Sequence, residues 1–136
     1  MSVFKSEDEV NQIFGTFLRE ITSDPALGPK FLASNTSFKI CFTDPEANLF
    51  VDATKDPVEV EVGDTAATSD ADVELMMTAD DGHKFWLGDM NLMGALARRK
   101  IKPKGEVTKL VGLLPTLQQA YGVYRQHAIN GGLPVG

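Results

Sequence analysis

The chain has 136 residues, of which 43% are hydrophobic and 24% are charged, and its formal net charge is −6 at pH 7. This size and composition are typical of one globular domain with a buried core, and they exclude a disordered chain. The acidic balance also argues against a nucleic-acid-binding protein, which needs a basic surface. We therefore expect a single domain over residues 1–130, followed by a flexible tail at residues 131–136.

The cysteine count and the hydropathy pattern indicate the cellular compartment. Cys41 is the only cysteine, which excludes an intramolecular disulfide, and its place in an apolar run predicts a buried, unreactive thiol. The polar, charged segment 1–8 is unlike a signal peptide. No apolar run approaches the roughly 18–20 residues that span a bilayer. These features predict a cytoplasmic protein.

Two helices are predicted at the start of the chain. Ser6 and Glu9 have the spacing of a capping box, which satisfies unpaired backbone donors at a helix start. Apolar residues then recur at helical spacing as far as Ile21, so that this helix has one buried face. Asp24-Pro25 predicts the start of a second, short helix that ends near Ser34.

A run of strands follows the two helices. Residues 38–42, 49–53 and 58–62 each alternate between the two faces of a strand, with short connections between them. Because parallel pairing needs a long crossover, these three strands are expected to form an antiparallel meander. The polar segment 63–70 then crosses to a fourth strand near residues 73–77.

The fourth and fifth strands enclose a helical pair. Met76 interrupts the polar side of the fourth strand, which predicts that both faces of this strand are covered. Residues 80–97 are expected to form two short helices, broken at Gly88-Asp89. A fifth strand is expected over residues 100–107, and Pro103 within it predicts an edge strand or a bulge.

The end of the chain completes the layered pattern. An apolar connection over residues 110–114 leads to a last helix, which is expected to begin at Pro115 and end at Asn130. Taken together, the elements predict an α+β fold, with a five-stranded, mainly antiparallel sheet and helices packed on one face.

Motifs for catalysis or for metal and cofactor binding are missing from the sequence. It contains no G-x-S-x-G, no dinucleotide-binding fingerprint, no C-x-x-C and no H-x-x-x-H pattern. His83 and His127 stand in no recognisable catalytic motif, and Asp80-Asp81-Gly82 lacks the ligand spacing of a calcium loop. We therefore expect no catalytic residue, no metal site and no cofactor.

Two local clusters leave alternatives open. Residues 85–96 hold a tryptophan, a phenylalanine and several methionines and leucines, which either close an ordinary core or line an adaptable apolar cavity. A basic cluster is either a solvated edge of the sheet or a contact with lipid headgroups. It consists of Arg98, Arg99, Lys100, Lys102 and Lys104.

The order of elements and three segments in particular resemble the sterol-carrier-protein-two family of small lipid-transfer domains. These are the strand at residues 73–78, the helical pair at residues 85–96, and the lysine-rich strand at residues 100–107 with its glycine. The resemblance covers nearly the whole chain. It implies a sheet and helices that enclose an apolar tunnel for a fatty acid, an acyl-CoA or a sterol, without catalysis.

This resemblance leads to a first hypothesis, a lipid-binding or lipid-transfer domain. Its partner would be a lipid or fatty-acyl ligand, and transient membrane contact and a homodimer stay open. The residues expected to form the pocket wall are apolar and come from the fourth strand, the helical pair and the last helix with its approach. They are Leu75, Met77, Phe85, Trp86, Met90, Leu92, Met93, Leu96, Leu113, Leu114, Leu117 and Tyr121. Phe14, Phe17 and Leu18 could be either wall or plain core.

Two further hypotheses remain. The same fold with a filled interior could act as an interaction or oligomerisation module that serves an enzyme. An enzyme acting on a lipid would need a polar constellation inside the pocket, for instance His83 beside an acid.

Overall fold

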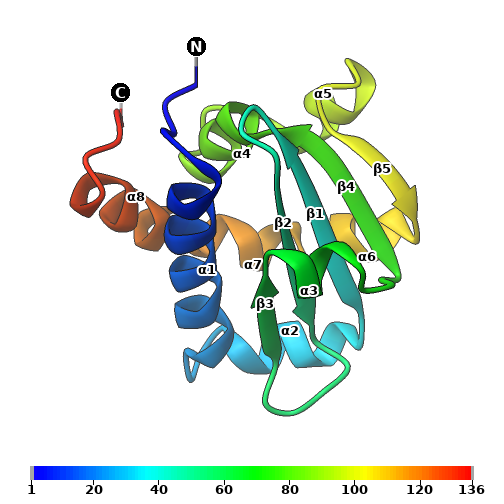
Figure 1. The fold of residues 1–136 in the computed structure, drawn as a ribbon. Helices are drawn as coiled ribbons and strands as arrows, with labels where there is room; N and C mark the ends of the chain where they lie inside the picture. The colour runs from blue at the N-terminus through cyan, green and yellow to red at the C-terminus, as the bar shows by residue number, and fades with distance from the viewer. Residues whose placement is uncertain (1, 136) are drawn as a thin grey trace.

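Five strands form one mixed sheet within residues 2–135, the part of the chain that the computed structural model describes. The strands are β1 (Ser37–Thr43), β2 (Ala47–Asp52), β3 (Glu59–Val62), β4 (Val73–Thr78) and β5 (Lys102–Gly105). Their order across the sheet is β3-β2-β1-β4-β5 (Figure 1). Met1 and Gly136, the outer ends of the predicted domain and tail, lie outside the described residues.

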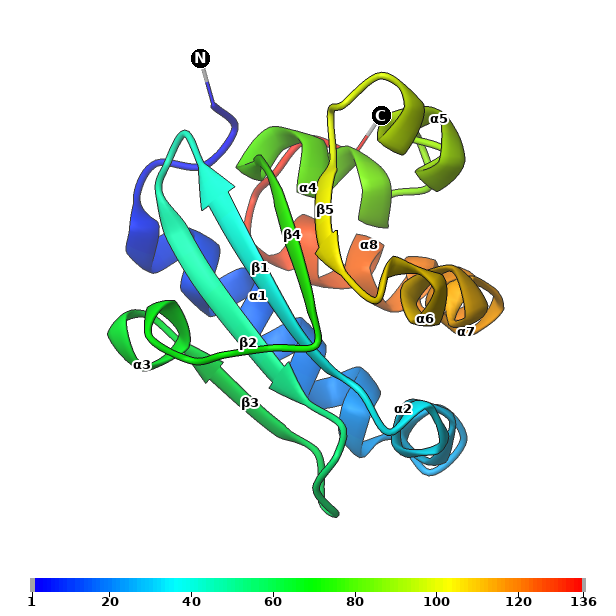
Figure 2. The same cartoon turned by 90° about the vertical axis from the view of Figure 1, so that its right-hand side faces the viewer.

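Helices cover mainly one face of this sheet, which we call the inner face. Those described are α1 (Glu7–Ser23), α2 (Gly28–Ser34), α3 (Asp64–Ala67), α4 (Ala79–Trp86), α5 (Leu92–Ala97), α6 (Val107–Gly112), α7 (Leu114–Gln119) and α8 (Tyr121–Asn130). In Figure 2, α1 and α8 lie behind the sheet, on its inner face. α1 packs against β2 and β3, whereas α4 and α6 pack against β4. The α+β fold class predicted from the sequence is confirmed.

The start of α1 follows the sequence closely, but α2 begins later than expected. The Ser6 hydroxyl accepts a hydrogen bond from the Glu9 amide at 3.2 Å, which caps α1. The carboxylate of Asp24 instead accepts from the amides of Ala26 and Leu27, at 2.8 and 3.1 Å. Asp24 therefore stabilises a turn, and the helix itself begins at Gly28, so the predicted start at Asp24-Pro25 is wrong.

The sheet is mainly antiparallel, as predicted. β1, β2 and β3 form the expected antiparallel meander, and β5 pairs antiparallel with β4. The remaining pairing, between β1 and β4, is parallel, and it places Ile40 beside Leu75. The long connection through β2, β3 and α3 makes this parallel pairing feasible.

The outer face of the sheet is only partly covered. The short helix α3 contacts β2 and β3 there. Phe50 and Ala66 are buried on this side, and Lys39 donates a hydrogen bond to the Ala67 carbonyl at 2.7 Å. Met76 of β4 lies beyond this cover and is 51% exposed. The prediction that both faces of β4 are covered is therefore wrong.

β5 is shorter than predicted and ends at a sharp turn. It is an edge strand, which explains how it accommodates Pro103. At Gly105 the backbone has φ +90°, and a Cβ atom built there would lie 2.1 Å from the backbone oxygen of Asp72. The same oxygen accepts from the Glu106 amide at 3.0 Å. Only glycine fits this close approach, and the chain then enters α6 at Val107.

The C-terminal third contains more helix breaks than the sequence indicates. The predicted apolar connection at residues 110–114 is mostly helical, because it contributes to α6 and to the start of α7. The predicted single helix from Pro115 to Asn130 is divided at Ala120, which is fully buried. After this break, α8 packs against α1 and α4.

A buried hydrogen-bond chain fixes the C-terminal segment against α4 and α8. Nε2 of His83 lies 2.7 Å from the carbonyl oxygen of Pro134, and Nδ1 lies 2.7 Å from the hydroxyl of Tyr124. Since a carbonyl only accepts, Nε2 donates, and in the neutral ring Nδ1 accepts from Tyr124. Leu133 is buried, and Arg125 donates to the Val135 carbonyl at 2.7 Å. The segment expected to be flexible thus holds defined contacts as far as Val135.

The turn at Gly105 yields a stability prediction. Gly105→Ala should lower the free energy of unfolding by about 3 kcal/mol, because the added Cβ meets the Asp72 backbone in a left-handed conformation. Gly112→Ala is the matched control, since a Cβ atom added there would have no neighbour within 4 Å and the position requires no positive φ. Urea unfolding followed by circular dichroism would measure the free energy of unfolding of both variants. Equal values for Gly105→Ala and Gly112→Ala would contradict this account.

The His83 hydrogen bonds yield a second prediction. Tyr124→Phe should cost about 1–3 kcal/mol, because it leaves Nδ1 of the buried His83 without a partner. Tyr121→Phe removes the same atom from a half-buried tyrosine whose hydroxyl forms no hydrogen bond with the described residues. Thermal unfolding should therefore separate the two variants, and a similar small shift in both would show that the His83 contact contributes little.

Alkaline pH tests the same hydroxyl by another route. Burial raises the pKa of Tyr124 above its ordinary value of 10.0, so the folded protein keeps a proton that the unfolded chain releases. This contribution to stability is complete below about pH 10 and is lost as the pH rises above it, by up to ~1.4 kcal/mol per pH unit. Tyr124→Phe should show a correspondingly shallower loss, measured by urea unfolding between pH 9 and 11, roughly spanning the tyrosine range.

Candidate functional site

An apolar cavity of about 70 Å³ lies between the inner face of the sheet and the helices. Seventeen of its lining residues are apolar and the remaining one is Thr22. The hydroxyl of Thr22 donates to the Leu18 carbonyl at 2.7 Å, so its proton is already used within α1. The cavity therefore offers a ligand almost no hydrogen-bonding partners, and its chemistry is that of apolar contact.

Strand alternation places one set of wall residues. Every second side chain of a strand points to the same face, so β1, β2 and β4 each turn a short apolar row inward. These rows are Phe38, Ile40 and Phe42 from β1, Leu49 and Val51 from β2, and Leu75 and Met77 from β4. In the register, Ile40 lies opposite Leu49 on one side and Leu75 on the other, which makes the floor of the cavity continuous across three strands.

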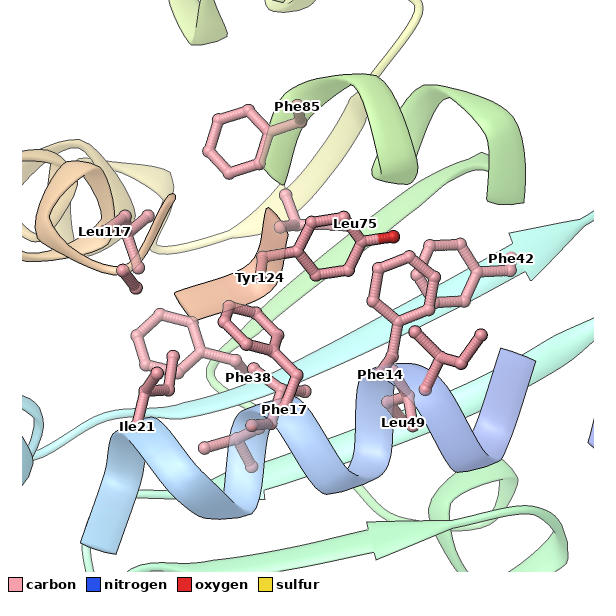
Figure 3. Packing of buried hydrophobic residues seen from close by; sticks show 14 of the residues in the cluster. Phe14, Phe17, Ile21, Phe38, Phe42, Leu49, Leu75, Phe85, Leu117 and Tyr124 are labelled. Atoms are coloured by element: carbon pink, nitrogen blue, oxygen red, sulfur yellow. The ribbon is translucent and has the colours of Figure 1, made fainter. Parts of the chain in front are cut away.

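The helices supply the facing wall. Six helices and two residues just outside them contribute. These are Phe14, Leu18 and Thr22 of α1, Phe31 of α2, Phe85 and Trp86 of α4, Leu92 of α5, Leu110 of α6 and Leu117 of α7, together with Ile101 before β5 and Leu113 between α6 and α7. Figure 3 shows Phe85 and Leu117 on the helical side and Leu75 and Phe38 on the side of the sheet. Elements distant in sequence thus converge on one space.

Aromatic rings form the side of the cavity nearest α1. Phe14 stacks on Phe42 with ring centroids 4.9 Å apart and on Tyr124 at 5.4 Å. Trp86 meets Phe17 and Phe85 edge to face, at 4.7 and 5.1 Å. Such pairs add a specific geometry to the apolar contact, so this side of the wall is well packed.

Seven of the residues predicted as pocket wall do line the cavity. They are Leu75, Met77, Phe85, Trp86, Leu92, Leu113 and Leu117. The structure thus brings together predicted residues from β4, the helical pair and the approach to the last helix. Their contact with a ligand stays a prediction.

The other five predicted residues do not line the cavity. Met93 is 54% exposed, and Met90 lines a separate surface groove. Leu96, Leu114 and Tyr121 are half-buried against the outside of the core. For Met93 and Leu96 the reason is the short length of α5, whose six residues turn only Leu92 and Ala95 inward.

Part of the wall was not predicted from the sequence. The inner rows of β1 and β2 were recognised as strand faces, yet nothing local connected them with residues of the helical pair. Phe14 and Leu18, which could have been wall or core, line the cavity, whereas Phe17 is fully buried beside it. Strand alternation was the available signal for Phe38 and Ile40, but their place at the cavity depends on the pairing of β1 with β4.

Titratable groups lie apart from the cavity. Both ring nitrogens of His83 are hydrogen-bonded inside the protein, and this residue does not reach the cavity wall. Cys41 is half-buried on the outer face, and burial raises the pKa of its thiol although Lys39 acts in the opposite direction. Among residues 2–135, no group of three or more His, Cys, Asp or Glu side chains could hold a metal ion. None of the helices in this range is long and apolar enough to cross a membrane.

Comparisons with known proteins identify a family and similar folds. Residues 14–117 match the SCP-2 sterol transfer family. The fold is similar to that of sterol carrier protein 2 from Yarrowia lipolytica in its apo form, with a TM-score of 0.66 and 22% identity over 89% of this chain and 98% of that chain. It is also similar to sterol carrier protein domain 2 of Helicoverpa armigera, with a TM-score of 0.65 and 17% identity over 90% and 96% of the two chains.

A third similar structure is part of an enzyme. The inverting sec-alkylsulfatase Pisa1 from Pseudomonas sp. matches with a TM-score of 0.51 and 17% identity, over 69% of this chain and 13% of that chain. A comparison with curated proteins gives no match. Because the family match covers most of the chain, including the inner strands and the start of α7, the chain belongs to the SCP-2 sterol transfer family.

Proposed function

We propose that this protein binds one long apolar molecule, such as a fatty acid, an acyl-CoA or a sterol, in the cavity and carries it without changing it chemically. The observation that supports this most is the lining, in which seventeen residues are apolar and the single polar one has its proton engaged. Membership of the SCP-2 sterol transfer family supports lipid binding or transfer in general. The ligand and the absence of catalysis are our proposal.

The energetics of burial are sufficient for such binding. Each methylene group removed from water contributes about 0.8 kcal/mol, so a chain of ~12–16 carbons offers on the order of 10 kcal/mol. Loss of translational and rotational freedom costs ~4–15 kcal/mol. When that cost lies at the lower end of its range, a chain of about 16 carbons keeps ~9 kcal/mol of binding free energy, which corresponds to micromolar or somewhat tighter binding without a specific polar contact. Selectivity among apolar ligands should then be broad.

The cavity must enlarge to admit a whole lipid. Its volume of about 70 Å³ is well below the ~300–1,000 Å³ of pockets that hold drug-sized molecules. The wall from Leu110 to Leu117 consists of two helices of six residues each, α6 and α7. Short helices joined by a break have few internal hydrogen bonds to lose, so we propose that a ligand displaces this wall and leaves α1 in place.

The small volume also favours one alternative. Under this alternative, the domain is an interaction module that has an essentially filled core and that serves an enzyme or forms oligomers. The similarity to a part of an alkylsulfatase chain shows this fold inside an enzyme, although only for that protein. An enzymatic role for His83 receives no support, because its ring nitrogens are engaged away from the cavity.

A titration tests the proposal directly. Trp86 is the only tryptophan and lines the cavity, so its fluorescence should change on addition of a fatty acid of about 16 carbons, with one-to-one stoichiometry. Leu117→Phe should weaken binding roughly tenfold by occupying cavity volume, which native-like circular dichroism would separate from unfolding. Met93→Phe, which adds a ring at an exposed position, is the matched control.

The outcome that would overturn the proposal is equally specific. Delipidated protein that binds no fatty acid, no acyl-CoA and no sterol would exclude the carrier function. If the same sample self-associates in analytical ultracentrifugation, the interaction module would be the better description.

A further inference from the structure

The two edges of the sheet carry opposite charges. β3 and β5 end the strand order, so in the described part of the chain each leaves one side of its backbone unpaired by another strand. Figure 1 shows them on opposite sides of the sheet. β3 has the sequence Glu-Val-Glu-Val and β5 the sequence Lys-Pro-Lys-Gly. An unpaired edge can add a strand from another chain, so the charges on an edge help to decide which strand it accepts.

The charged side chains of both edges point to the outer face of the sheet. Lys102 lies opposite Met76 in the register of β4 with β5, and Glu61 lies opposite Phe50 in the register of β2 with β3. Met76 and Phe50 both belong to the outer face, and residues directly opposite each other share a face. The second lysine of β5 and the second glutamate of β3 follow by alternation. A β5 edge beside a β3 edge therefore places opposite charges on one surface.

The same charges disfavour the pairing of like edges. Two β5 edges would bring lysines together and two β3 edges would bring glutamates together, and like charges opposite each other destabilise a strand pair. Lys102 and Lys104 are exposed and form no ion pair with the described residues. Glu59 pairs with Lys55 at 3.0 Å, whereas Glu61 has no such partner there. The charges thus favour β5 of one molecule beside β3 of another.

The strand directions also suit this pairing. β3 and β1 both run antiparallel to β2, and β4 runs parallel to β1, so that β3 and β4 point the same way. β5 runs antiparallel to β4. When two copies lie side by side in the same orientation, β5 of one therefore meets β3 of the other in an antiparallel arrangement. The inner faces of both copies stay on the same side of the combined sheet.

The backbone at the β3 edge offers a donor at Val60. In an antiparallel ladder, bonded pairs alternate with non-bonded pairs, whose backbone groups point away from the partner strand. The Gly63 amide donates to the Asn48 carbonyl at 3.1 Å, so by alternation the backbone groups of Val60 face the free edge. The Val60 carbonyl accepts from the guanidinium of Arg19 at 3.3 Å. Val60 therefore presents its N–H to a new strand, while its carbonyl already has a donor.

The backbone at the β5 edge offers the complementary acceptor. The Glu106 amide donates to the Asp72 carbonyl at 3.0 Å, and the same alternation turns the backbone of Pro103 toward the free edge. Proline has a carbonyl but no N–H. Pro103 therefore presents an acceptor without a donor, which matches a residue that needs only an acceptor.

We propose that β5 pairs with β3 of a second copy of this chain, with Pro103 opposite Val60 of the second copy. In this register the Val60 amide donates to the Pro103 carbonyl. The N–H that proline lacks is not needed, because Arg19 of the second copy already donates to the Val60 carbonyl. Each hydrogen-bonding group at the centre of the contact is thus satisfied.

The charges agree with the same register. It sets Lys102 opposite Glu61 and Lys104 opposite Glu59 of the second copy, in non-bonded pairs, where side chains approach most closely. A shift of two residues in either direction would lose one of these two pairs. None of these residues lines the apolar cavity, so this contact is independent of the proposed lipid binding. Because it joins two different edges, each pair of copies keeps a free edge of both kinds, and the assembly grows with concentration.

Charge reversal tests the choice of the partner strand. Sedimentation velocity of the full chain at up to about 1 mM should show self-association that weakens as salt is added. Lys102→Glu with Lys104→Glu, and separately Glu59→Lys with Glu61→Lys, should each weaken it roughly tenfold, because like charges then face each other. An equal mixture of the two reversed proteins should associate again, since each then supplies the edge that the other lacks.

A matched control shows whether position or only net charge matters. Lys5→Glu with Lys84→Glu changes the net charge by the same amount as the reversal of β5, at exposed positions outside the sheet. This control should retain most of the association. Circular dichroism would show that all the variants keep the native fold.

Removing one donor separates a strand ladder from charge attraction alone. Arg19→Met removes a cation from the acidic edge, so attraction between charges alone would become stronger. In the proposed ladder the same change should weaken association roughly fivefold, because the Val60 carbonyl loses this donor. Adding Pro103→Ala should restore the association, because alanine supplies an N–H to that carbonyl.

Three results would overturn the proposal. The first is a protein that stays monomeric at about 1 mM, or reversed proteins that do not associate when mixed. The second is stronger association of Arg19→Met, which would show charge attraction without a ladder. The third is a monomeric protein that binds a synthetic peptide of residues 57–64, which would show that β5 accepts an acidic strand from a different partner.

Discussion

Two groups of helices cover the inner face of the central strands, and they meet there without filling the space between them. α1 lies over β2 and β3, and α4 and α6 lie over β4. α8 connects the two groups: its Tyr124 stacks on Phe14 of α1 at a centroid distance of 5.4 Å, and α8 also packs against α4. The cavity is the part of the apolar interface that this contact does not reach, so its position follows from how far apart the two groups of helices are held.

The sequence was most informative where a pattern is local. Alternation in residues 58–62 identified a strand, and the Ser6 cap identified the start of α1, because each depends on a few neighbouring residues. The sequence was less informative where contacts with residues far away in the chain determine the local structure. Nothing near Asp24 shows that its carboxylate closes a turn, and nothing near Ala120 shows that the last helix divides there.

The same division explains the candidate site. Residues of β4 and α4 were recognised as pocket wall because the family resemblance concentrates there. Met93 was included by composition, but in a helix of six residues it lies away from the face that carries Leu92. Phe38 and Ile40 were not assigned to the wall, since the parallel pairing that sets them beside β4 joins segments that are far apart in the chain. The local sequence pattern predicts which side chains share one face of a strand. The pairing of distant strands determines whether that face lines the cavity.

The parallel pairing has a consequence for how the protein reaches its native state. The hairpins among β1, β2 and β3 need only short loops, but Phe38 meets Val73 only after the whole intervening chain has been closed into a loop. Closing that loop costs conformational entropy before the stabilising contacts between β1 and β4 can form. Long-range pairings of this kind therefore slow folding. Because Ile40 and Leu75 become neighbours in this step, a nascent chain acquires its apolar compartment only when the slowest part of the topology has formed.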